Sequence, residues 1–90
     1  MKAVILDFHT FDAPRAVHEY LAEHLHFPEY YGKNLDALHD CLTDLSEDIC
    51  VTVVCAGKDF ENGFLAVLED AAEENRHFFL TGRANPRRKA

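Results

Sequence analysis

The side chains with the clearest chemical potential in this sequence are three aspartates that recur at every fourth position. A helix would place Asp36, Asp40 and Asp44 on one face, because residues four apart lie one above the other. Lys33 and Lys58 are the nearest lysines or arginines on either side of them. Like charges at this spacing destabilise a helix by about 0.2–0.5 kcal/mol per pair. The stripe is therefore either an ordinary solvated face or a surface kept for a basic partner.

A second acidic group follows later in the chain. Glu69, Asp70, Glu73 and Glu74 fall opposite the apolar positions of a predicted helix, again with no cation among them. Runs of charge usually mark solvated surface, so this alternative stays open for both groups. The missing counter-charge weakens the solvated-surface interpretation, because ordinary protein surfaces mix the two signs.

Catalysis finds little support in the residue pattern. His39 and Cys41 lie two apart, so a helix points them in different directions and they make a poor base and nucleophile. No P-loop, GxSxG, HExxH or CxxC pattern occurs. We therefore expect a binding protein that is not an enzyme and uses no cofactor and no metal. A metal-dependent hydrolase built on Asp36, Asp40 and the acids of residues 69–74 is the remaining catalytic alternative.

Two adjacent tyrosines precede the first acidic stripe. Tyr30 and Tyr31 allow two interpretations. One ring packs into the core while the other is merely exposed, or the exposed ring, next to carboxylates, belongs to a protein-binding surface.

Apolar spacing and turn residues predict the elements that must position these side chains. A buried strand is expected over residues 2–8. A helix follows, which we expect to be capped by Thr10 or Asp12 with Pro14 in its first turn.

The rest of the chain continues this alternation of strands and helices. Asn34 is a good N-cap for a helix over residues 34–45, whose leucines lie opposite the aspartates. Residues 49–55 are apolar on both faces, which is typical of a strand buried within a parallel sheet. A helix over residues 64–75 and a strand over 77–80 complete an α/β fold with a small parallel sheet.

The charge balance narrows the class of partner. The 90 residues carry a net charge of −7, and residues 1–82 carry −11 because they hold 5 basic against 16 acidic residues. This balance argues against sequence-independent nucleic-acid binding and against an anionic membrane surface, so the expected partner is a neutral or basic protein. The length predicts one domain, which we assign to residues 1–82. Residues 83–90 form a basic tail that we expect to be disordered, or alternatively folded back onto the acidic helices.

The cysteine count indicates the compartment. Cys41, Cys50 and Cys55 are odd in number and cannot all pair within the chain. The apolar run of residues 3–6 is too short for the core of a signal peptide. We therefore expect reduced thiols in a cytoplasmic protein. As a separate expectation, the protein is a monomer when it is free of its partner.

Residues 28–43 carry a family resemblance. Their sequence, PEYYGKNLDALHDCLT, closely resembles the barstar family, the intracellular inhibitors of barnase-type ribonucleases. The resemblance extends more loosely over most of residues 1–81. It implies a single α/β domain with a three-stranded parallel sheet and about three to four helices. It also implies a stoichiometric inhibitor that covers the basic active site of a ribonuclease with its acidic helix.

The resemblance also implies roles for individual residues. Asp40 would occupy the phosphate-binding site of the ribonuclease, Asp36 would pair with a further cation, and Tyr30 would pack on the catalytic histidine. The contact helix would be completed by Asn34, Ala37 and Thr43, and Asp70 would supply one more acidic contact from the last helix.

The sequence departs from the family pattern at several positions. His39 stands where the family usually has tryptophan, and Asp44-Leu45 stands in place of a Gly-Trp pair, so we include His39 and Asp44 among the contacts. The connection between the second strand and the last helix is short, which predicts a trimmed or missing helix there. These departures keep open a second function, a regulatory interaction domain that binds another basic protein.

Overall fold

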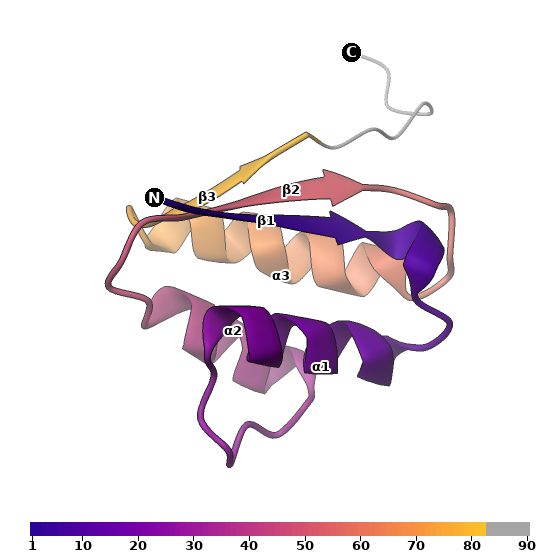
Figure 1. Ribbon diagram of the computed structural model, residues 1–90, viewed down its shortest axis with the longest axis horizontal. Helices are drawn as coiled ribbons and strands as arrows, with labels where there is room; N and C mark the ends of the chain where they lie inside the picture. Colours follow the sequence, from indigo (N-terminus) through magenta and orange to yellow (C-terminus); the bar gives the residue numbers. More distant parts are fainter. Residues whose placement is uncertain (83–90) are drawn as a thin grey trace.

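Three parallel strands form the sheet of this protein (Figure 1). In the computed structural model, which describes residues 1–82, β1 (Lys2–Asp7), β2 (Ile49–Val54) and β3 (Phe78–Thr81) pair in the order β1-β2-β3. The predicted α/β fold with a three-stranded parallel sheet is confirmed. The predictions made for the tail concern residues 83–90, which lie outside the described residues.

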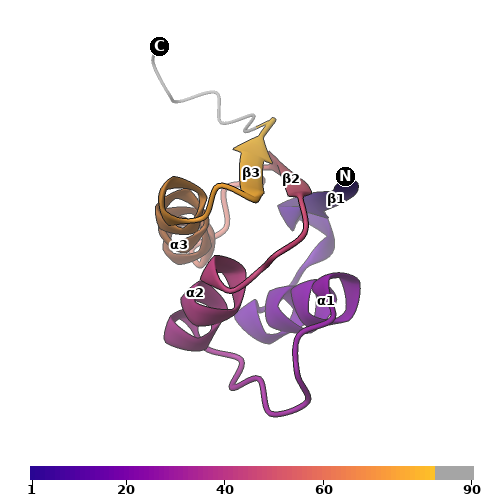
Figure 2. The ribbon, with the colours of Figure 1, turned by 90° about the vertical axis from the view of Figure 1, so that its left-hand side faces the viewer.

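Three α-helices lie on one side of this sheet (Figure 2). They are α1 (Pro14–Leu25), α2 (Leu35–Thr43) and α3 (Glu61–Glu74). A short 3-10 helix, η1 (Phe8–Thr10), follows directly on β1. The number of α-helices lies at the lower end of the three to four expected, and residues 55–60 contain no helix, as the short connection predicted.

On the opposite face of the sheet, no helix of residues 1–82 covers the strands, which corrects one expectation. Along β2, Ile49, Val51 and Val53 are buried, whereas the residues between them are only half-buried. On the neighbouring strands, Ile5 is 60% exposed and Phe79 is 42% exposed on this open side. The prediction that residues 49–55 are buried on both faces is therefore wrong. Apolar and β-branched residues also suit a pleated sheet that is covered on one face.

The hydrophobic core fills the space between the sheet and the three helices. Fully buried side chains come from every layer, among them Leu6, Leu21, Leu38, Phe64 and Phe78. The leucine side of α2 predicted from the sequence thus faces the core, and this fixes which face of α2 is left for solvent.

The start of α1 differs from its prediction. Ala13 is the N-cap residue and its side chain makes no capping bond, while Pro14 occupies the first turn as expected. The Thr10 hydroxyl instead donates a 2.8 Å hydrogen bond to the carbonyl oxygen of Asp7. The predicted cap from Thr10 or Asp12 is wrong because η1 places Thr10 in a turn of its own.

The bounds of α2 and α3 are close to those predicted. Asn34 is the N-cap of α2, as expected, but the helix ends at Thr43, with Asp44 as its C-cap. α3 begins at Glu61, three residues before the predicted start, and ends before Asn75. No helix within residues 1–82 is long and apolar enough to cross a membrane.

Candidate protein-binding surface

α2 turns its acidic stripe away from the core. Leu38 and Leu42 are fully buried beneath the helix, and Asp36, Asp40 and Asp44 are all exposed on its outer side. None of the three carboxylates makes an ion pair or a hydrogen bond with another side chain of residues 1–82. The geometry of the predicted stripe is thus present, and it carries uncompensated negative charge.

The amino end of α2 is fixed by Asn34. Its Oδ1 accepts a 2.8 Å hydrogen bond from the backbone N–H of Ala37, which satisfies one of the open donors of the first turn. Gly32 lies against this cap, because an added Cβ would come within 3.1 Å of Asn34 Nδ2. Asn34 is exposed and Ala37 is half-buried, so both predicted contact residues lie at the start of the acidic face.

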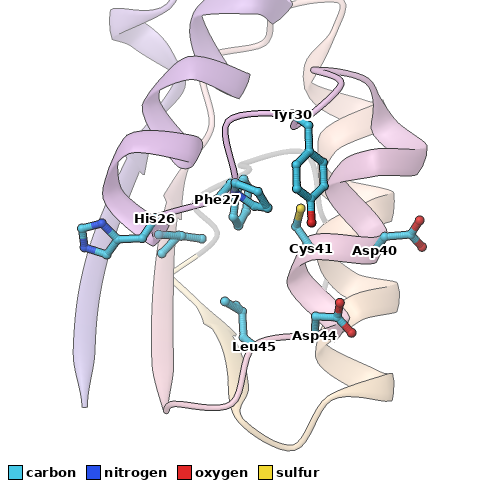
Figure 3. A pocket seen from close by; sticks show the side chains of 9 residues that line it. His26, Phe27, Tyr30, Asp40, Cys41, Asp44 and Leu45 are labelled. Carbon is cyan, nitrogen blue, oxygen red and sulfur yellow. The ribbon is translucent and has the colours of Figure 1, made fainter.

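The two adjacent tyrosines of the loop before α2, residues 26–34, have opposite environments. Tyr30 is 87% exposed, whereas Tyr31 is 6% exposed and packs against Phe27, with 4.9 Å between the ring centroids. Both interpretations of the pair include an exposed ring next to the carboxylates, so this arrangement agrees with either one. The exposed Tyr30 ring stands beside α2 (Figure 3).

A buried histidine anchors this loop to α1. His18 is 4% exposed, and a 2.6 Å hydrogen bond joins its Nδ1 to the Tyr31 hydroxyl. Burial, with a smaller effect from the charge of Lys33, holds the pKa of His18 below its ordinary value of 6.5. Burial also raises the pKa of Tyr31. The pair therefore stays neutral at neutral pH and holds Tyr31, and with it the Tyr30 backbone, in place.

α3 extends the acidic face beside α2. Nε2 of His39 lies 3.3 Å from Oε2 of Glu74, which joins the two helices at their surface. Asp70 is exposed one turn before Glu74 on α3. We refer to the combined face as the acidic surface, defined by Asp36, Asp40 and Asp44 of α2 and Asp70 and Glu74 of α3.

Two polar residues fix the carboxyl end of α2. The Asn75 side chain is buried, and its Nδ2 donates hydrogen bonds to the carbonyl oxygens of Leu42 at 2.8 Å and Leu45 at 3.0 Å. The Thr43 hydroxyl donates to the carbonyl oxygen of His39 at 3.0 Å. Thr43 thus stabilises its own helix, and Asn75 ties the end of α2 to the end of α3.

A hollow of about 270 Å³ separates the loop of residues 26–34 from the second half of α2. In Figure 3, the Phe27 and Tyr30 rings stand on the loop side, and the Cys41 side chain points from α2 toward the Tyr30 side chain. We call it the α2 hollow; its main lining residues are Phe27, Tyr30, Asp40, Cys41, Asp44 and Leu45.

The Cys41 thiol at this hollow is poorly suited to nucleophilic chemistry. Burial raises its pKa, and the neighbouring charges of Asp40 and Asp44 raise it further. His39, the only base suggested beside it in the sequence, is engaged with Glu74 instead. Among residues 1–82, no group of three or more His, Cys, Asp or Glu side chains is placed to hold a metal ion.

Comparison with known proteins agrees with the observed fold. The family model described as barstar (barnase inhibitor) matches residues 1–81, which span every element from β1 to β3. The chain belongs to the barstar family. A relative from Bacillus subtilis (strain 168), named "Putative ribonuclease inhibitor YrdF", is 38% identical over 87 aligned positions. The alignment covers 88% of this barstar-family chain and 94% of that relative.

Three contacts that hold the acidic surface in place were not predicted from the sequence. The hydrogen bond of His18 joins it to a residue 13 positions away, and that of Asn75 reaches the carbonyl oxygen of Leu42, 33 positions away. The contact of Glu74 with His39 spans 35 positions. Of these residues, only the burial of His18 could have been predicted from the sequence, because it lies between Val17 and Leu21 on the buried side of α1.

Proposed function

We propose that this protein is a stoichiometric inhibitor of a barnase-type ribonuclease, acting as a monomer in the cytoplasm and without catalysis of its own. The observation that carries the proposal is the stripe of exposed carboxylates on α2, which form no ion pair within residues 1–82. A ribonuclease active site is built to bind polyanions, so fixed carboxylates at a suitable spacing can replace the phosphates of RNA. Family membership and the name of the Bacillus subtilis relative support an inhibitor of ribonuclease as the class.

The proposed roles follow the resemblance to the barstar family, and the exposure of these side chains on the acidic surface supports them. Asp40, in the middle of the stripe, takes the phosphate-binding site, and Asp36 pairs with a further cation at one end. Asp44 adds negative charge at the carboxyl end of α2, and Asp70 adds negative charge from α3. Such a surface attracts a basic cleft from a distance, which accelerates association at low ionic strength.

The uncharged contacts have a different proposed part. Tyr30 offers a rigid exposed ring for packing against a catalytic histidine of the ribonuclease. Asn34 and Thr43 fix the helix through hydrogen bonds to its backbone, and Ala37 is small enough to let the partner approach closely. His39 lies between the acidic side chains of α2 and α3 and would contact the rim of the cleft.

The test is inhibition of RNA cleavage by a purified barnase-type ribonuclease. The first ribonuclease to be tried is one whose gene lies beside the gene for this protein. We expect loss of cleavage at one equivalent of the protein. Asp40→Asn keeps the shape of the side chain and removes its charge. Hydrogen bonds to charged groups contribute about 1.5–3 kcal/mol, so the variant is expected to bind about 10- to 150-fold more weakly.

Asp12→Asn is the matched control, because it removes the same charge from an exposed aspartate outside the acidic surface. Its inhibition should equal that of the unchanged protein. Inhibition that survives Asp40→Asn unchanged would contradict the phosphate-mimic mechanism. Failure to inhibit any such ribonuclease, with capture of a different basic protein, would instead favour the regulatory interaction domain.

A further inference from the structure

The α2 hollow has features that the acidic stripe alone does not have. It is a concave site of about 270 Å³, and its walls are mainly apolar. This volume is slightly below the range of about 300–1,000 Å³ that is usual for small-molecule sites. The hollow therefore suits one side chain of a partner better than a separate small ligand.

The charge of the hollow is negative and uncompensated. Asp40 and Asp44 lie one helical turn apart along its α2 side, and Asp44 is also the C-cap residue, at the negative end of the helix dipole. No lysine or arginine of residues 1–82 lines the hollow, and His26 is its one basic side chain. Lys2 lies in an adjoining depression that shares Asp44, but the two side chains form no ion pair within the described residues.

The apolar walls specify the kind of cation. The Tyr30 ring lies on one side, Phe27 and Leu45 flank the space, and the protonated Cys41 thiol lines it from α2 (Figure 3). A ligand that fills this space needs an apolar stem that ends in a charged group. Arginine meets this requirement better than lysine, because its planar guanidinium pairs with carboxylates in a fork and stacks on an aromatic ring.

We propose that the α2 hollow binds an arginine side chain presented by the partner, with Asp44 holding the guanidinium and Tyr30 and Leu45 covering its stem. The identity of the partner as a ribonuclease rests on the proposed function above, whereas the chemistry of the hollow does not. In this proposal, Asp44 determines specificity, because it favours partners that have an arginine positioned to enter the α2 hollow.

The chemistry of the hollow is tested with a small probe and the full chain. We would titrate the ¹⁵N-labelled protein with N-acetyl-L-arginine amide at low ionic strength and follow backbone amide shifts. We expect saturable shifts concentrated at Phe27, Cys41, Asp44 and Leu45. N-acetyl-L-citrulline amide has the same shape without the charge, and we expect no saturable shifts with it.

Two variants locate the binding. Asp44→Asn should weaken binding of the arginine probe about two- to fivefold, the range expected for an exposed ion pair. Asp12→Asn should leave it unchanged, since Asp12 precedes α1 and the hollow lies at the other end of that helix, about 18 Å away. Equal binding of arginine and citrulline, shifts spread evenly over the acidic surface, or no effect of Asp44→Asn would each overturn the proposal.

Ribonuclease inhibition separates failure of this inference from failure of the proposed function. Inhibition that is lost in Asp40→Asn but unchanged in Asp44→Asn would overturn the arginine site while leaving the inhibitor function intact. Saturable arginine binding that depends on Asp44, in a protein that inhibits no ribonuclease, would support the site and contradict the proposed function. A measurable loss of inhibition in both variants supports the two together.

Discussion

Removal of one oxygen atom from Tyr31 tests how the binding loop is held. The Tyr31 hydroxyl is the partner of Nδ1 of His18 at 2.6 Å, and both residues are buried. In Tyr31→Phe the ring still packs against Phe27, but the histidine nitrogen loses its hydrogen bond. A buried polar group without a partner costs about 1–3 kcal/mol, so the free energy of unfolding should fall by that amount.

Urea denaturation followed by circular dichroism measures this change directly. In a thermal scan, a domain of 60–100 residues loses about 4–8 °C of Tm for each kcal/mol. Tyr30→Phe is the matched control, because it removes the same atom from the neighbouring ring, which is 87% exposed. Its effect should stay within about 0.5 kcal/mol, as for most surface substitutions.

A comparison of the two variants decides the outcome. If Tyr31→Phe is as stable as Tyr30→Phe, the bond between His18 and Tyr31 does not anchor the loop, and the physical reason given for the position of Tyr30 is wrong. A clear difference between them supports the anchor.

Three other outcomes are expected from the same framework. Asn34→Ala removes the α2 cap and should lower the free energy of unfolding by about 1 kcal/mol in urea denaturation. Asn75→Ala should cost more, about 1–3 kcal/mol for each carbonyl left without its donor, because Leu42 and Leu45 lose their contacts together. Because the pKa of His18 is lower in the folded protein than its ordinary 6.5, its contribution to stability is complete above about pH 6.5. This contribution is lost progressively as the pH falls below that value. Urea denaturation midpoints measured between pH 5 and 7.5 should show the loss. In His18→Gln, the part of the pH dependence of stability that comes from His18 should be absent.

Local sequence patterns were sufficient to predict where the main strands and helices of the fold lie. The period of apolar residues and the Asn34 cap located α2 to within two residues, and β2 was located to within one. Two details depended on tertiary structure. The cap of α1 was wrong because η1 engages Thr10, and the two-sided burial of β2 was wrong because the helices cover one face of the sheet.

The candidate surface was predictable only where spacing along one helix defines it. The stripe of Asp36, Asp40 and Asp44 follows from the helical period alone. The groups that hold it in place, His18 and Asn75, act on residues far away in the sequence, so no local pattern reveals them. The α2 hollow likewise depends on tertiary structure, because residues 25–30 and residues 40–45 line it together.

The kinetic mode of inhibition tests most directly whether the acidic surface replaces RNA in a ribonuclease cleft. Rates of RNA cleavage by a purified barnase-type ribonuclease are measured at several concentrations of RNA and of this protein. Competitive inhibition is expected, in which the apparent KM for RNA rises with inhibitor while kcat is unchanged, and Asp40→Asn weakens the effect. A lowered kcat at unchanged KM would mean that the protein binds outside the RNA site and would contradict the central claim.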